Sequence, residues 1–124
     1  MNYLQFKNEK VFRNFVAKPH HPNLIEVLWY ILEKCGEVVV TSAYRYGDRG
    51  VHGTDPLRAV DLRSWIYSDG FQEFLLKEVN ETFTYDPQRE KMKVMIKHNV
   101  RDKGIHFHCQ VSSRTVKNGI GESG

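Results

Sequence analysis

Hydrophobic and polar residues alternate strictly along residues 105–111. Side chains of a strand point alternately to its two faces, so this pattern predicts a strand with one face in the core and the other exposed. His106, His108 and Gln110 fall on the exposed face, opposite Ile105, Phe107, Cys109 and Val111. An exposed strand face does not require two histidines about 7 Å apart. We interpret them as half of a metal site.

Similar patterns predict two helices and three further strands. Residues 22–35 carry apolar side chains at helical spacing, with Asn23 as the N-cap and Gly36 at the end. A second helix begins after the cap Ser68 and presents an apolar stripe of Phe71, Phe74, Leu75, Val79 and Phe83. Strands are predicted over residues 38–44, 58–64 and 92–100, and the last forms a hairpin with residues 105–111.

These elements indicate one α+β domain over residues 1–124, with helices packed on one face of a small antiparallel sheet. A chain of 124 residues with 40% hydrophobic content can bury a core without disulfides. Residues 1–20 show no clear period and are left as an unassigned lead-in. Residues 112–124 are predicted to form a flexible tail.

Composition narrows the classes of partner. The net charge of +3 is modest and the basic residues are scattered, which argues against a nucleic-acid partner. The chain has no apolar run long enough to span a membrane and no signal-peptide pattern at its start. Cys35 and Cys109 are expected to be free, buried thiols, which favours a reducing compartment. We therefore expect a cytoplasmic monomer.

A metal site needs ligands from several elements, because catalytic zinc usually takes three protein ligands and leaves one position for water. The last strand offers His106 and His108, and the glycine-rich loop before the second strand offers His52. Asp61 lies on the outward side of the second strand. These four residues can meet on one face of the sheet.

Other roles are open for the charged residues. Asp61 could instead form a salt bridge with Arg58, Arg63 or Arg45, and Arg45 could simply pair with Asp48.

Three aromatic residues near the predicted site are also ambiguous. His98 lies at two-residue spacing from Val94, Ile96 and Val100, so all four would share one face of a strand. Because the other three are apolar, this predicts a structural histidine on the core face. Trp65 and Tyr67 could line a substrate groove, although aromatic packing is the simpler role.

The order of the motifs resembles a known family. Ser42-Ala43-Tyr44-Arg45 precedes His52 and Asp61, and His106-Phe107-His108 follows. This combination over residues 38–111 resembles the zinc D-Ala-D-Ala carboxypeptidases and their relatives, which are cell-wall peptidases that share a fold with the hedgehog signalling domain. The resemblance implies the hedgehog/DD-peptidase fold.

The resemblance also implies roles for five residues. His52, Asp61 and His108 would bind Zn2+, Arg45 would hold the scissile carbonyl or a substrate carboxylate, and His106 would move protons or stabilise the oxyanion. The implied reaction is hydrolysis of a peptidoglycan stem peptide by metal-activated water, as a carboxypeptidase or an endopeptidase. A phage- or prophage-derived protein that acts on the cell wall would fit this reading.

Two departures keep alternatives open. His52 and Asp61 are nine positions apart, against seven in the family, so the loop carries an insertion. Residues 103–105 also lack the Glu that serves many members as general base, and Asp102 falls in the predicted turn. The alternative is a zinc-stabilised binding or structural module with little turnover. A metal-dependent phosphodiester hydrolase is a third hypothesis.

Overall fold

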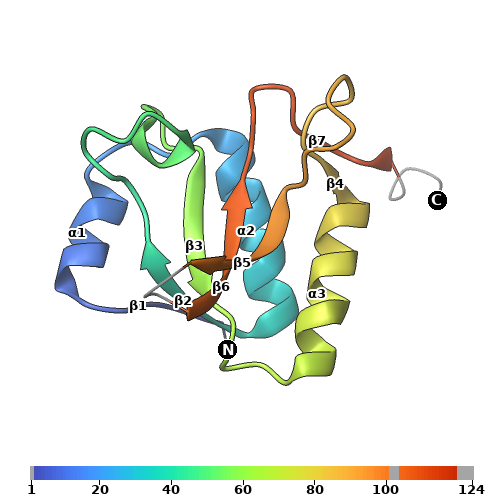
Figure 1. Ribbon diagram of the computed structural model, residues 1–124, viewed down its shortest axis with the longest axis horizontal. Coiled ribbons are helices and arrows are strands. Elements are labelled where there is room, and N and C mark those ends of the chain that lie inside the picture. The colour runs from blue at the N-terminus through green and yellow to red at the C-terminus, as the bar shows by residue number, and fades with distance from the viewer. Residues whose placement is uncertain (1, 101–103, 120–124) are drawn as a thin grey trace.

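The computed structural model describes residues 2–100 and 104–119. Its centre is a five-stranded sheet in the order β1 (Tyr3–Phe6), β2 (Glu37–Ser42), β3 (Ala59–Arg63), β6 (Gly104–Gln110) and β5 (Met95–Val100) (Figure 1). β1 pairs with β2 in parallel, whereas the other neighbouring strands are antiparallel. The class is α+β as predicted, but the prediction of a purely antiparallel sheet is wrong.

The mixed sheet arises from the segment that the sequence pattern left unassigned. Residues 2–20 form β1 and helix α1 (Glu9–Val16), which begins at Asn8, whose side chain accepts a hydrogen bond from the amide of Val11. Phe6 of β1 packs on Phe12 and Phe15 of α1. Because α1 and α2 (Pro22–Cys35) connect β1 to β2, the two strands can run in the same direction.

Helices α2 and α3 (Asp69–Thr82) begin and end close to the positions that their sequences predict. Gly36 ends α2 with a φ of 76°, and the Ser68 hydroxyl caps α3 by accepting from the Phe71 amide. The N-cap of α2 is His21, whose Nδ1 accepts from the Asn23 amide, so the assignment of Asn23 as the cap is wrong. Proline as the first helical residue makes the preceding position the cap.

The core lies between the sheet and helices α2 and α3, and α2 is seen behind the sheet in Figure 1. Strand residues that point into it include Val40, Val60, Leu62, Phe107 and Cys109, all at most 1% exposed. Residues of opposite phase on β3 and β6 point away from the core, as predicted. This second face of the sheet, here called the open face, carries Asp61, His106 and His108.

Some residues that were predicted to be buried are exposed. Ile105 is 51% exposed because it lies at the start of β6, beyond the packed part of the sheet, and Phe74 on α3 is 47% exposed. Phe83 is buried, but it lies after α3 in the short strand β4 (Phe83–Thr84).

Residues 112–119, predicted as part of a flexible tail, pack on the domain. β7 (Val116–Lys117) pairs with β4. Ser112 and Thr115 are buried, and both hydroxyls donate to the carbonyl of Tyr85, at 2.7 and 2.8 Å. The remainder of that predicted tail, residues 120–124, lies outside the described residues. Across the described part of the chain, no helix combines the length and apolar character needed to cross a membrane.

Candidate metal centre

Asp61 is the centre of the open face. Its neighbours in the sheet are Ser42 of β2 and His108 of β6. The residue is only 3% exposed. Burial alone would raise the pKa of its carboxyl, but hydrogen bonds and charges from His108 and His52 outweigh burial and hold the pKa below its usual range. Asp61 is therefore an ionised carboxylate at neutral pH, surrounded by imidazoles.

His52 reaches Asp61 from the short 3-10 helix η1 (Val51–Gly53). Its Nδ1 lies 2.8 Å from the carbonyl oxygen of Ala43, and a carbonyl can only accept, so Nδ1 carries the proton. In the neutral ring, Nε2 then presents a lone pair, and it lies 3.2 Å from Asp61 Oδ1. The backbone of the Ala43 segment thus fixes both the tautomer and the direction of the ring.

His108 reaches the same oxygen from the strand next to β3. Gln110 Nε2 donates to the carbonyl of Lys93 at 2.9 Å, which leaves Gln110 Oε1 as the acceptor facing His108 Nε2 at 3.1 Å. His108 Nε2 therefore donates, and in the neutral ring the lone pair of Nδ1 then points to Asp61 Oδ1, 2.9 Å away. Both imidazoles are oriented by a second hydrogen bond, as is usual for metal-binding histidines.

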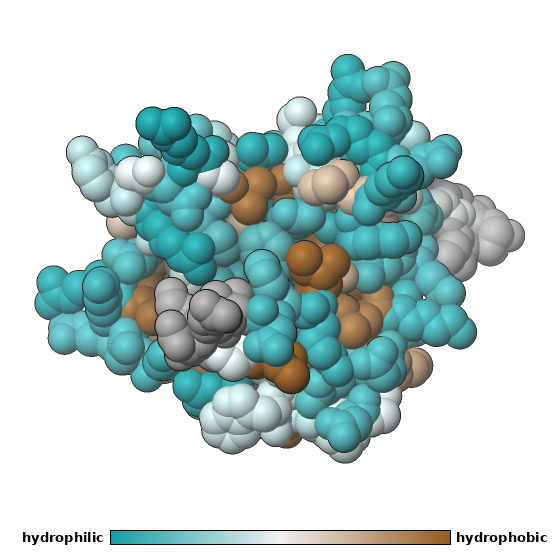
Figure 2. Space-filling model, viewed as in Figure 1, coloured by the Kyte–Doolittle hydropathy of each residue, from teal (hydrophilic) through white to brown (hydrophobic). Residues whose placement is uncertain are grey.

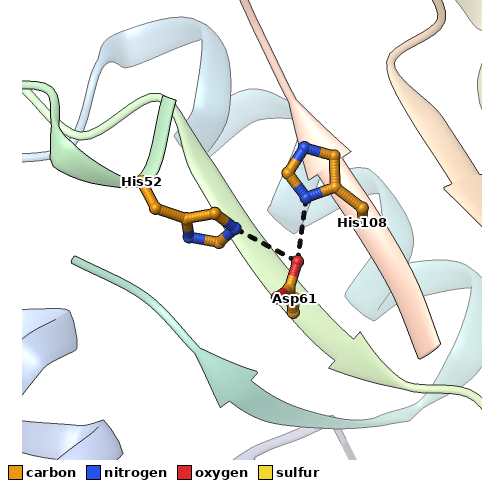
Figure 3. A group of neighbouring side chains, drawn as sticks. All are labelled: His52, Asp61 and His108. Atoms are coloured by element: carbon orange, nitrogen blue, oxygen red, sulfur yellow. Dashed lines mark hydrogen bonds and ion pairs between the residues drawn. The ribbon is translucent and has the colours of Figure 1, made fainter. Parts of the chain in front are cut away.

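Three electron-pair donors consequently converge, as Figure 3 shows. The candidate ligand atoms of His52, Asp61 and His108 all lie within 4.8 Å of one another. When protonated, both rings can donate to Asp61 Oδ1; when neutral, both direct a lone pair to this oxygen, where a cation can take the place of the two protons. The group could hold a metal ion, and it consists of the three residues that the resemblance implied as ligands.

Arg45 contacts the other oxygen of the carboxylate. Its Nη2 donates to Asp61 Oδ2 at 2.9 Å, its Nε donates to Ser42 Oγ at 3.0 Å, and its Nη1 lies 3.6 Å from Asp48 Oδ2. The pairing of β2 with β3 shifts register between Val40 and Ser42, so that Ser42 lies opposite Asp61, three residues before Arg45. Two of the alternatives left open by the sequence, pairing of Arg45 with Asp61 and with Asp48, therefore both occur.

His106 completes the cluster without joining the three ligand atoms. Its Nε2 lies 3.5 Å from Asp61 Oδ2, and its side chain is 12% exposed. Burial lowers the pKa of His106, the Asp61 carboxylate opposes this effect, and His98 reinforces it, so the pKa lies below the ordinary histidine value. His106 is thus a neutral imidazole at the surface of the groove.

His98 was predicted to face the core, and that prediction is wrong. It is exposed, pairs with His106 across β5 and β6, and its ring centroid lies 5.6 Å from that of His106. The phase of β5 is set by Met95, which is 1% exposed and exchanges two hydrogen bonds with Asn80 of α3. Ile96 and His98 therefore share the open face, and the apolar Ile96 is itself 37% exposed.

A groove on the open face has two lobes that meet at Arg45, Asp61 and His106. The lobe over β5, here called the β5 lobe, has a volume of about 440 Å³ and is also lined by His52, Lys91, Met92, Lys93, Ile96, His98, His108 and Gln110. The Trp65 lobe, of about 480 Å³, is also lined by Lys7, Thr41, Ser42, Arg63, Trp65, Gly104 and Ile105. The metal-ligand group therefore lies in the β5 lobe, beside the residues that the two lobes share.

The two aromatic residues that follow β3 have different roles. Trp65 lines the Trp65 lobe, is 70% exposed, and lies 4.9 Å under the guanidinium of Arg63. Tyr67 instead packs on Phe71 and Phe107 and joins the core. Of the two roles that the sequence left open, Trp65 therefore lines the groove and Tyr67 packs against the core.

The contact of Gln110 with His108 makes a testable prediction. We expect Gln110→Met to weaken metal binding by about 10- to 100-fold, because the orientation of His108 is lost while its side chain remains. Isothermal titration with zinc measures the affinity. Gln72→Met is the matched control, since Gln72 is equally buried and donates to a backbone carbonyl, that of Tyr67, on the other side of the sheet. Equal affinities in both variants would contradict the role of Gln110.

Gly53 holds the loop of His52 close to another part of the backbone. A Cβ at Gly53 would lie 1.8 Å from the carbonyl oxygen of Asp48, so the backbone must move. We expect Gly53→Ala to cost about 1–3 kcal/mol of folding stability and to weaken zinc binding through His52. Gly70→Ala is the control, since a Cβ there meets nothing within 4 Å. Thermal melts with and without zinc compare the two, and identical behaviour would refute the prediction.

Comparison with known proteins gives no match: no protein-family model, no curated protein and no solved structure is similar to this chain. The function must therefore be inferred from the groove and from the side chains that meet in it.

Proposed function

We propose that this protein is a zinc-dependent peptidase of the D-Ala-D-Ala carboxypeptidase type, with the hedgehog/DD-peptidase fold, and that it hydrolyses peptidoglycan stem peptides. One observation carries the proposal. Two imidazole nitrogens and one carboxylate oxygen converge in the groove, and the hydrogen bond from each ring to Ala43 or Gln110 directs its free lone pair to the same point. That donor set, with one position left for water, is the set that catalytic zinc prefers.

Zinc held by His52, Asp61 and His108 would supply a Lewis acid and a water whose pKa is close to 7. The side chains beside it suit the remaining tasks. His106 is a neutral imidazole on the groove surface, so its free nitrogen can accept a proton from water and later return it to the leaving amine.

Arg45 suits the stabilisation of negative charge. Its guanidinium is fixed by Ser42 and Asp61 and remains 41% exposed toward both lobes. A positive charge held in place before the reaction can stabilise an oxyanion without reorganisation. In the resting protein the same contact keeps Arg45 next to the ligand carboxylate.

The general base must come from a side chain that lines the groove. Among the described residues that line the two lobes, Asp61 is the only carboxylate, and it belongs to the ligand group. Asp102 lies outside the described residues. We therefore assign the base to His106.

A second candidate is a zinc-stabilised binding module of the same fold with little or no turnover. The lack of a second carboxylate in the described lining of the groove favours it. The engagement of Arg45 by Asp61 and Asp48 also favours it, because an arginine already paired has less charge to offer a substrate.

Incubation with muropeptides separates the two candidates. We expect the zinc-loaded protein to release free D-Ala or to generate a new amine, followed by mass spectrometry and amine labelling. His52→Ala and the chelated wild type should both be inactive, because each lacks a bound zinc. Absence of product at high protein concentration, with zinc shown to be bound, would reject the peptidase in favour of the binding module.

A further inference from the structure

Two lobes of the open face meet at Arg45, Asp61 and His106, and the metal-ligand group lies at this end of the β5 lobe. The β5 lobe lies over the outer strand β5 and the segment before it, whereas the Trp65 lobe lies over β2, the end of β3 and the start of β6. Both lobes include Asp61 and His106, so the reacting bond would lie where they meet. A substrate that fills both lobes must extend from that bond in two directions.

Each lobe carries its own positive charges. Lys91 and Lys93 line the β5 lobe, and Lys7 and Arg63 line the Trp65 lobe. Within the described part of the chain, none of these four side chains forms an ion pair with an acidic residue. The guanidinium of Arg63 stacks on the ring of Trp65, and this contact does not neutralise the charge. Both sides of the reacting bond therefore offer cations to a ligand.

Apolar surface accompanies the charges in both lobes. Ile96 is 37% exposed in the β5 lobe, and Ile105 and Trp65 are 51% and 70% exposed in the Trp65 lobe. Figure 2 shows this side of the molecule as mostly hydrophilic, with a few hydrophobic residues exposed between polar ones. Exposed aromatic and aliphatic side chains inside a groove are typical of a binding site.

We propose that the protein is an endopeptidase for acidic peptides, which binds a chain with a carboxylate on each side of the cleaved bond. This inference rests on the proposed peptidase function and decides between its two forms. Lys91 and Lys93 would pair with a carboxylate on one side of the bond, and Arg63 and Lys7 with one on the other. Trp65 would pack on the chain between them.

A peptide fits these features better than a nucleic acid. The basic residues that line the groove lie in two short lobes, and the net charge of the chain is only +3. Proteins that bind single strands usually combine an extended basic track with several stacking aromatic residues. Here Trp65 is the one tryptophan, tyrosine or phenylalanine among the described residues that line the lobes.

Product analysis tests the position of the cut. A zinc-loaded sample is incubated with a stem pentapeptide whose carboxylates are free, and the products are identified by mass spectrometry. We expect cleavage at a bond before the last one, so that the carboxyl-terminal product has two or more residues. Release of the last residue alone would overturn this inference while leaving the peptidase function intact. Absence of any hydrolysis would instead count against the peptidase function itself.

Substrate and protein changes are then combined to test the two lobes. We expect Lys91→Gln with Lys93→Gln, or Arg63→Gln with Lys7→Gln, to raise KM by roughly threefold to tenfold. This increase in KM should disappear when the peptide carboxylate that faces the mutated lobe is amidated. It should persist when the carboxylate on the other side is amidated. Lys77→Gln, on the exposed side of α3 and away from the groove, is the control. Equal KM changes for free and amidated peptides would overturn the assignment.

Binding gives a readout that does not need turnover. Fluorescence anisotropy of the same labelled peptide should show affinities that fall in both double variants and on amidation. The inference would fail if the double variants bind the free peptide as tightly as the wild type. It would also fail if a single-stranded oligonucleotide of equal charge displaces the peptide at lower concentration.

Discussion

Asp61→Asn should lower the affinity for zinc by more than about 100-fold. The substitution preserves the shape of the side chain but removes the negative charge that lies between His52 and His108. A single oxygen of Asp61, Oδ1, lies 3.2 Å from His52 Nε2 and 2.9 Å from His108 Nδ1. The wild-type protein should gain about 2.7 kcal/mol of stability when zinc is present at 100 times its dissociation constant. In Asp61→Asn this increase in melting temperature should disappear.

The control for this prediction is Asp86→Asn. Asp86 is similarly buried, at 7% exposure, and accepts a hydrogen bond from the Gln88 amide at a distance from the groove. That variant should keep the full zinc-dependent rise in melting temperature. His52→Ala and His108→Ala should lose it, as Asp61→Asn does. Full zinc occupancy in all three ligand variants would refute the site.

His106→Ala should lower kcat by about 10²- to 10⁴-fold, which is the usual contribution of a general acid or base. Its ring lies 3.5 Å from the second oxygen of Asp61 and is directed into the groove, so its loss removes a proton acceptor and leaves the three ligand atoms in place. Zinc content should remain that of the wild type. Steady-state hydrolysis of a muropeptide and metal analysis of the same sample measure both quantities.

His20→Ala is the matched histidine control, because His20 packs on Phe15 in the groove between α1 and α2. It should retain turnover and zinc. If His106→Ala loses zinc while His108→Ala retains it, the roles of the two histidines are reversed. If both activity and zinc survive in His106→Ala, His106 has no catalytic role.

The part of the fold around the site could be predicted because its strands alternate cleanly. β3 and β6 each have one face of apolar residues and one of polar residues, and only one register puts both apolar faces in the core. β1 and α1 could not be predicted in the same way. Their apolar residues, such as Phe6 and Phe12, pack largely on each other at the edge of the sheet, so no single period emerges.

The candidate ligands could be predicted from residue type and order, whereas their surroundings could not. His52 and His108 lie on elements far apart in the chain, and only the geometry reveals that Ala43 and Gln110 orient their rings. His98 was assigned to the wrong face because Val94, Ile96 and Val100, at two-residue spacing from it, are all apolar. The strand is instead placed by Met95, through a contact with α3 that no local pattern encodes.

X-ray absorption at the zinc edge of the zinc-loaded protein tests the metal centre most directly. We expect a shell of about four nitrogen and oxygen ligands at roughly 2.0–2.1 Å, with the multiple scattering of two imidazoles and one carboxylate. After free zinc has been removed, His52→Ala and His108→Ala should show no zinc edge, because neither variant retains the metal. A sulfur ligand, or a spectrum without imidazole scattering, would contradict the site formed by His52, Asp61 and His108.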